Sequence, residues 1–133
     1  MYNQQHKAVA PLLGMTSFEE VLHRMNELGR FKASVLASND GLPIATAPSV
    51  YDADTAAAIV ALLQRVSKEA RDQLDMAEVD EVTIFDRDRI RLVCRYMVVD
   101  EEKLILAVMV PPNRYHRRLT NWAMREIQAA WQQ

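Results

Sequence analysis

The side chains that most often carry out chemistry are few in this sequence and stand far apart. The three histidines, His6, His23 and His116, have no cysteine or carboxylate at the spacing of a metal site, so we expect surface or half-buried histidines. The single cysteine, Cys94, follows the alternation of a predicted strand, which indicates a buried thiol. With three glycines in the chain, no phosphate-binding loop or dinucleotide fingerprint is present. We therefore predict no catalytic residue, no cofactor and no metal.

Arginine is the chemically notable side chain that recurs with a pattern. Arg89, Arg91 and Arg95 share one side of a predicted strand. Further arginines follow towards and along the last predicted helix, some of them in its first turns, where the helix dipole disfavours cations: Arg114, Arg117, Arg118 and Arg125. Two interpretations stay open. Arg89, Arg91 and Arg95 either form a docking surface for an acidic partner or belong to a solvated face that pairs with nearby carboxylates.

Bulk composition excludes several classes of protein. The chain has 133 residues, 50% of them hydrophobic, which suits one domain with a real core. The net charge of −2, from 16 basic and 18 acidic residues, argues against nucleic acid as the main partner. One cysteine excludes an internal disulfide and fits the cytoplasm, and no apolar run approaches the roughly 20 residues of a membrane span. We expect a loose arm at residues 1–14 and a single domain at 15–133.

The elements that must position these residues begin with a hairpin at residues 31–47. Apolar and polar side chains alternate from Phe31 to Ala37, which predicts a strand with one apolar face. Asn39-Asp40-Gly41 is a tight-turn signal, because Gly supplies the positive φ that a short hairpin needs. Pro43 cannot donate to a ladder, so the second strand of this hairpin should lie at a sheet edge.

The other elements follow from capping signals and periodicity. Ser17 and Glu20 form a capping box that starts the first helix. Asp52 or Asp54 can cap the next helix, which runs to about Leu74. The remaining predicted elements are the strands Val79–Phe85, Arg89–Val98 and Leu104–Val110 and a final helix opened by Pro111-Pro112 and running towards Trp131.

The resulting pattern, αββαβββα, predicts an α/β (α+β) sandwich. The strand Leu104–Val110 is apolar at every position, which favours a central place in the sheet. Val79–Phe85 contains polar residues and suits the other edge. The simplest arrangement is a five-stranded antiparallel sheet in the order 2-1-5-4-3, with the second helix alone on one face and the terminal helices on the other.

The second helix has more apolar surface than one sheet can cover. Ala58, Ala61 and Leu62 lie outside its main apolar stripe, so its first half is apolar nearly all round. We predict a homodimer interface here, joined by Val82 and Ile84 of an edge strand that pairs with its own copy. The alternative is that alanine merely raises helix propensity.

The pattern resembles the Roadblock (dynein light-chain) family. The matching features are the turn DGLPIA at Asp40–Ala45, the alanine-rich helix Thr55–Ala70 and the meander that ends in LILAVMV, and the likeness covers about Ser17 to Ile127. The resemblance implies a profilin-like sandwich and a dimer that joins the second helices and the edge strands preceding the fourth strand. Because bacterial members include regulators of small Ras-like GTPases, it also implies such a GTPase as partner.

The leading hypothesis is a non-enzymatic homodimeric adaptor or regulator that binds a small Ras-like GTPase and modulates its nucleotide cycle. If an arginine were inserted into the partner, Arg87 or Arg89 in the predicted turn would be the first candidates. The alternative is a small-ligand sensor domain of a signalling complex, although the core-facing positions offer few polar groups to orient a ligand. An enzyme in its own right would need a nucleophile, a base and an orienting group that converge, and the sequence offers none.

Overall fold

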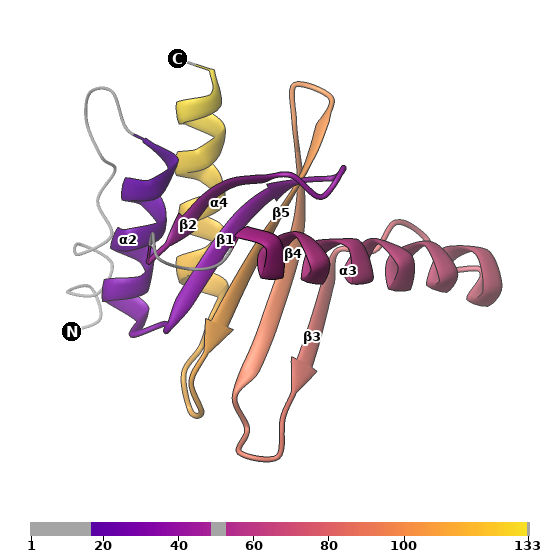
Figure 1. Ribbon diagram of the computed structural model, residues 1–133, viewed down its shortest axis with the longest axis horizontal. Helices are drawn as coiled ribbons and strands as arrows, with labels where there is room; N and C mark the ends of the chain where they lie inside the picture. The colour runs from indigo at the N-terminus through magenta and orange to yellow at the C-terminus, as the bar shows by residue number, and fades with distance from the viewer. Residues whose placement is uncertain (1–16, 49–52, 133) are drawn as a thin grey trace.

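The computed structural model describes residues 17–48 and 53–132, which form three helices around one sheet (Figure 1). The predicted order αββαβββα is confirmed. The elements are α2 (Phe18–Gly29), β1 (Ala33–Ser38), β2 (Pro43–Ala47), α3 (Ala53–Leu74), β3 (Glu81–Phe85), β4 (Arg91–Val99), β5 (Glu102–Val110) and α4 (Arg117–Trp131). The predicted arm at residues 1–14 and the predicted caps Asp52 and Asp54 lie outside the residues and side chains that the structure describes.

The sheet has five strands in the order β2-β1-β5-β4-β3, and every neighbouring pair is antiparallel, as predicted. The apolar run Leu104–Val110 lies in β5, the central strand, where both faces are covered. Pro43 opens β2 at one edge, where its missing N–H costs no ladder bond. Strand β3 forms the other edge.

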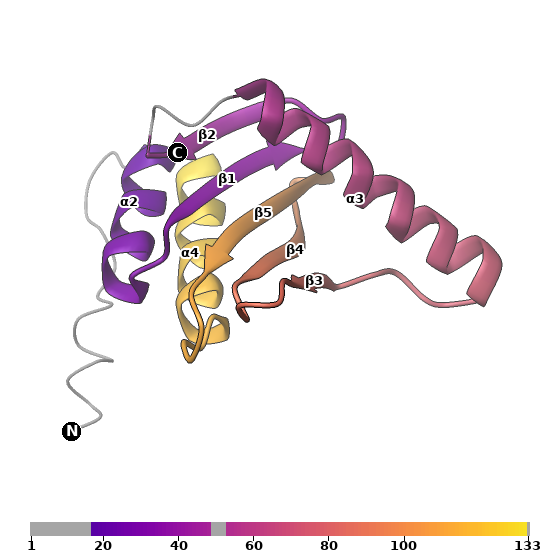
Figure 2. The same ribbon diagram turned by 60° about the horizontal axis from the view of Figure 1, so that its bottom comes forward.

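The helices divide between the two faces of the sheet. Helices α2 and α4 lie side by side on one face and α3 lies alone on the other (Figure 2). The larger hydrophobic core lies under α2 and α4 and includes Leu22, Met25, Leu106, Trp122 and Ile127. The smaller core lies under α3 and consists of Val35, Ala37, Val60, Leu63, Cys94, Ile105 and Ala107.

The first helix begins and ends through local chemistry. Glu20 N donates to Ser17 Oγ at 3.1 Å and Ser17 N donates to Glu20 Oε1 at 3.1 Å, which confirms the capping box. At the other end Arg30 takes the left-handed conformation, with φ of 57°. The neighbouring Gly29 is required by packing and not by backbone conformation, because a Cβ there would lie 2.4 Å from Cζ of the Phe31 ring. The chain can therefore turn at once into β1.

The start of the last helix differs from the prediction. Helix α4 begins at Arg117, not at Pro111-Pro112. Between these positions Asn113 has φ of 63°, which ends any helical path, and the Arg91 guanidinium donates to the carbonyls of Pro111 and Arg114. Strands β3 and β4 begin two residues later than expected, at Glu81 and Arg91. Strand β5 begins two residues earlier than expected, at Glu102.

Candidate interaction surfaces

Helix α3 exposes an apolar side. Val60 and Leu63 are buried against the sheet, whereas Leu62 is 54% and Val66 46% exposed. Ala58 and Ala61, the other predicted interface residues on this helix, are exposed as well. These side chains lie three or four residues apart and so form one continuous stripe. The stripe has no cover within the described protomer.

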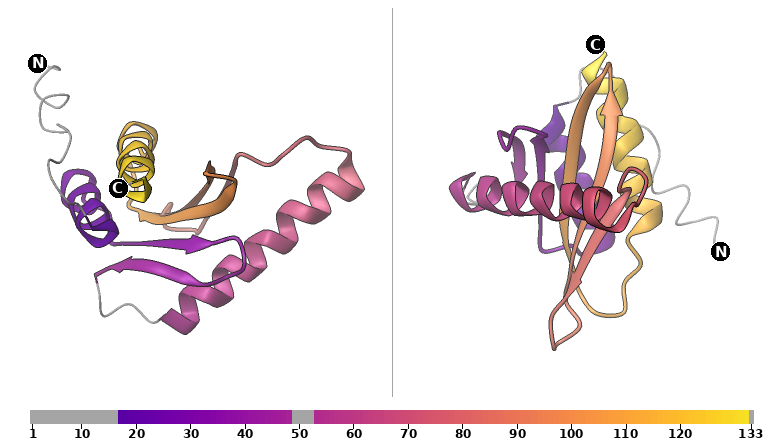
Figure 3. Two further views of the ribbon diagram at one scale, coloured as in Figure 1. Left: turned by 90° about the horizontal axis from the view of Figure 1, so that it is seen from above. Right: turned by 90° about the vertical axis from the view of Figure 1, so that its right-hand side faces the viewer.

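The C-terminal half of α3 projects past the β3 edge of the sheet (Figure 3). A side-chain hydrogen bond of 2.5 Å between Ser67 Oγ and Tyr96 Oη ties the middle of the helix to β4. Leu74, about three turns beyond Leu63, is 70% exposed because the helix has outrun its own sheet there.

Strand β3 brings the other two predicted interface residues to the same side. In the β3–β4 register Val82 lies opposite Cys94 and Ile84 lies opposite Leu92, on the face that α3 covers. Ile84 is 47% exposed, and Val82 is half-buried against the smaller core. The structure thus gathers all five predicted interface residues, with Val66 in addition, at the free edge and on the helix that crosses it.

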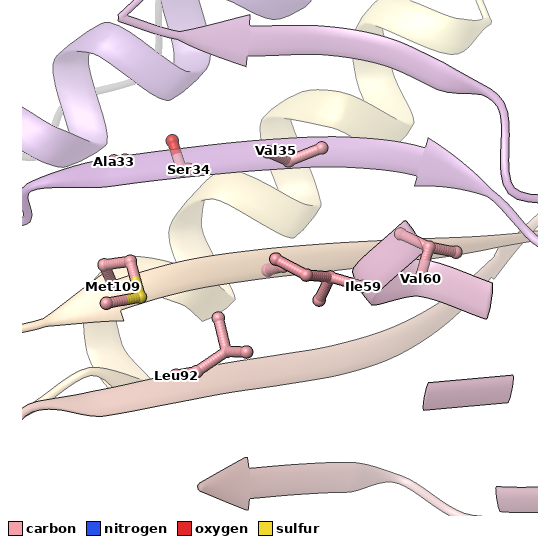
Figure 4. A pocket seen from close by; sticks show the side chains of 8 residues that line it. Ala33, Ser34, Val35, Ile59, Val60, Leu92 and Met109 are labelled. Atoms are coloured by element: carbon pink, nitrogen blue, oxygen red, sulfur yellow. The ribbon is translucent and has the colours of Figure 1, made fainter. Parts of the chain in front are cut away.

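An apolar hollow lies beside α3 on the same face of the sheet (Figure 4). Met109 of β5 and Leu92 of β4 stand directly opposite each other in the ladder and line it together with Ile59 and Val60 of α3. The remaining lining residues are Ala33, Ser34, Val35 and Ala107. Ser34 stands opposite Val108 of the larger core, so its hydroxyl points to the other face of the sheet. The hollow therefore offers apolar side chains, which give little to orient a small ligand.

A second, polar groove lies where α3 projects past the sheet. Arg71 Nη1 and Glu78 Oε1 form an ion pair of 3.0 Å across its lining, and Lys103 Nζ lies 3.9 Å from Glu78 Oε2. Lys68 pairs with Asp72 at 2.6 Å along the helix. Since the groove's cations are matched by carboxylates at its own rim, its charges do not favour an ion of either sign.

The three predicted partner-binding arginines do not form one surface. Arg89 is exposed, and its guanidinium lies 4.2 Å from the centroid of the Phe85 ring. Arg91 is half-buried and holds the loop before α4 through the carbonyls of Pro111 and Arg114. Arg89 therefore remains available for docking, whereas Arg91 has a structural partner.

The prediction for Arg95 is corrected by its burial. Arg95 is 5% exposed, and its Nη1 donates to Thr120 Oγ1 at 2.8 Å and to Asn121 Oδ1 at 2.5 Å. The strand alternation that places Arg95 on the side of Arg91 is right, but α4 covers that side of β4. Its guanidinium therefore anchors α4 to the sheet and cannot dock a partner.

A carboxylate that sequence reasoning missed holds this polar region together. Glu81 Oε1 lies 3.2 Å from Arg117 Nη1, 3.3 Å from His116 Nε2 and 3.7 Å from Arg95 Nε, and Thr83 Oγ1 donates to Glu81 Oε2 at 2.9 Å. Burial opposes the charged form, but the hydrogen bonds from Thr83 and His116 outweigh it and hold the pKa of Glu81 below its usual value. Burial lowers the pKa of His116. Pairing the meander in register, which sets Glu81 opposite Arg95, is the signal that could have found this cluster.

The remaining reactive side chains are isolated. Cys94 is fully buried, as predicted, and burial raises the pKa of its thiol to about 12. His23 is exposed on α2. Within residues 17–48 and 53–132, no group of three or more His, Cys, Asp or Glu side chains could hold a metal ion.

Comparison with known proteins identifies the family. The family model of the Roadblock/LC7 domain matches residues 17–109, from the cap of α2 to the end of β5. The chain belongs to the Roadblock/LC7 family. A search of curated proteins found no match to this Roadblock/LC7 chain.

In the part of the chain that the structure describes, none of the helices is both long and apolar enough to cross a membrane.

Solved structures share the fold at low sequence identity. Myxococcus xanthus MglB is 14% identical with a TM-score of 0.70 and aligns over 86% of this chain and 94% of its own. A Roadblock/LC7 domain from Streptomyces avermitilis is 17% identical with a TM-score of 0.64, over 88% of this chain and 97% of its own. The gliding protein MglB from Thermus thermophilus is 13% identical with a TM-score of 0.65, over 92% and 93%. The predicted fold is thus shown by family and by structure.

Proposed function

We propose that this Roadblock/LC7 protein is a non-enzymatic homodimer that binds a small Ras-like GTPase and modulates its nucleotide cycle. The observation that carries the proposal is the apolar stripe of α3, with Leu62 54% exposed, beside the unpaired edge strand β3. A two-fold axis at that edge would cover both features with one contact. About 800 Å² buried per protomer would be ordinary for such an interface.

The GTPase partner rests on the family resemblance. A regulator of this kind needs no catalytic group of its own, because it can reorganise the active site of its partner. The reactive side chains support that role, since Cys94 is buried and His116 is held by Glu81. We place the activity in the cytoplasm, where a single free cysteine is unremarkable.

Arg89 is the arginine that we assign to the GTPase contact. It lies in the β3–β4 turn with φ of 68°, and Phe85 holds its guanidinium in an exposed position. Cations at the rim of an interface act mainly on the rate of association, because they steer the partner at long range.

The test is a titration of the cognate Ras-like GTPase, loaded with GDP or with a GTP analogue that is not hydrolysed, against the wild type and Arg89→Glu. We expect a preference for one nucleotide state, and slower association with a flatter salt dependence for Arg89→Glu. Arg125→Glu on α4, where Arg125 is also exposed, is the matched control and should behave as wild type. Equal affinity for both nucleotide states would reject regulation, because a ligand indifferent to state cannot shift the equilibrium.

A further inference from the structure

Strand β4 continues beyond the end of its ladder with β3. Tyr96 N donates to Asp80 O at 3.1 Å, whereas β4 runs on to Val99. Backbone groups alternate along an antiparallel strand, so Val98, two residues after Tyr96, points its N–H and C=O to the same side. The residue that would pair with it there is Glu78, but among the described residues no backbone group bonds to Val98 on that side. The end of β4 is therefore an open strand edge.

The segment before β3 leaves this edge uncovered because it is tied to α3. Asp75, with φ of 55°, ends the helical path, and Glu78 Oε1 lies 3.0 Å from Nη1 of Arg71 in the last turn of α3. The ion pair holds Glu78 beside the helix instead of opposite Val98. The open edge thus follows from the length of α3, which projects past the sheet and takes the connecting segment with it (Figure 3).

The open edge lies in the polar groove described above. The groove encloses about 530 Å³, which is within the size range of sites that hold a ligand. Val98 is 61% exposed and stands opposite Lys103, on the face of the sheet that α3 covers. Gln64 Nε2 donates to Asn39 Oδ1 at 2.8 Å, which joins α3 to the β1–β2 turn along the groove. The edge is therefore set inside a built concave site.

The groove lies on the flank of α3 away from Leu62 and Val66. Arg71 follows Leu62 by nine residues, or about two and a half turns, so the two side chains leave the helix on opposite sides. Gln64 follows Leu62 by two residues, about 200° round the same helix. A contact made through Leu62 and Val66 therefore leaves the groove uncovered, and the site is complete in one protomer.

The chemistry of the groove favours a peptide backbone over an ion. Arg71 and Lys103 both lie near Glu78, so their charges are offset within the groove. The unsatisfied groups are instead one N–H donor and one C=O acceptor of the same residue, Val98. A residue of an extended peptide matches both, because opposite residues of antiparallel strands can exchange two hydrogen bonds. Its side chain would lie on the same face as that of Val98, which favours an apolar residue.

We propose that β4 binds an extended peptide segment of a partner protein as an added strand at Val98, in the place that Glu78 leaves open. One peptide residue exchanges two backbone hydrogen bonds with Val98 and packs an apolar side chain against it. The neighbouring peptide side chains point alternately into the groove and away from it. This site goes beyond the proposed GTPase contact and requires neither the homodimer nor Arg89.

An NMR titration with the capped pentapeptide acetyl-Thr-Thr-Val-Thr-Thr-amide, up to millimolar concentration, tests the added strand. The amide resonance of Val98 should shift, and its hydrogen should exchange more slowly with solvent. The matched ligand carries N-methylvaline at the centre and cannot donate to the Val98 carbonyl, so it should bind about tenfold or more weakly. Equal binding of the two peptides would overturn the added strand, as would the absence of any shift at Val98.

Two protein variants test the location. Val98→Lys keeps the backbone groups but replaces the apolar contact at an exposed position, and should weaken the pentapeptide about tenfold while urea unfolding stays close to wild type. Leu62→Ala is the control on the opposite flank of α3 and should bind the pentapeptide as wild type does, whatever its assembly state. Wild-type affinity in Val98→Lys would overturn the site. Inorganic phosphate, titrated in parallel, should leave Val98 unshifted, and a shift with phosphate but not with the pentapeptide would reveal an ion site in its place.

Discussion

Truncating one leucine separates the cost of association from the cost of folding. Leu62 is 54% exposed in the protomer, so about half of its side chain is available to a partner. Burying a whole leucine side chain contributes about 1.5–3 kcal/mol, and the exposed half therefore contributes about 0.8–1.5 kcal/mol on dimerisation. A two-fold axis counts this twice, which gives about 1.5–3 kcal/mol per dimer. Leu62→Ala should therefore raise the dimer dissociation constant roughly 10- to 150-fold.

The same substitution should barely change the fold of the protomer. Alanine is the best helix former, and the buried neighbour Leu63 keeps α3 on the sheet. Sedimentation velocity over a dilution series measures the dissociation constant, and urea unfolding at a dilution where the wild type is monomeric measures protomer stability. Leu42→Ala is the control, because Leu42 is 65% exposed in the turn beside the opposite edge strand. An unchanged dissociation constant for Leu62→Ala would refute the reasoning, as would an equal effect of Leu42→Ala.

Three further predictions concern the protomer. Gly29→Ala should lower the free energy of unfolding by about 1–3 kcal/mol in urea titrations, because its Cβ would meet the buried ring of Phe31 at 2.4 Å. The thiol of Cys94, its pKa raised to about 12, should react with an alkylating reagent only in denaturant, as mass spectrometry can record. Because the pKa of Glu81 is lowered in the folded state, its contribution to stability is present above the unfolded pKa of about 4.3 and is lost as the pH falls through the folded value. The difference in Tm between wild type and Glu81→Gln should accordingly shrink below that pH.

The features that sequence could predict are those set by near neighbours along the chain. The Ser17–Glu20 capping box is a contact across three residues, and it forms as expected. The unbroken apolar run in β5 indicates a strand that is covered on both faces, and Pro43 indicates that β2 lies at a sheet edge. Together these two signals are enough to order the sheet. Burial of Cys94 follows from the same alternation.

The features that sequence could not predict depend on which distant segment covers a face. Arg95 alternates with its neighbours as a surface arginine would, and only the position of Thr120 and Asn121 on α4 makes it an internal anchor. The start of α4 was misplaced for a related reason. The guanidinium of Arg91 holds the carbonyl of Pro111 from a strand about 20 residues away, and no local propensity encodes that contact. Of the three predicted docking arginines, Arg95 is the one that this cover removes from the surface.

In the proposed homodimer, the inequality of the two cores makes α3 the part of the protein whose folding would depend on concentration. Among its described side chains, Val60 and Leu63 are the fully buried ones, whereas α2 and α4 share the larger core. Detaching α3 therefore uncovers the smaller of the two cores, and a detached α3 cannot hold a second copy. Local opening and dissociation become one linked equilibrium. Amide hydrogens of α3 should exchange faster as the protein is diluted, while those of β5 keep their protection, so the helix reports the assembly state of the molecule.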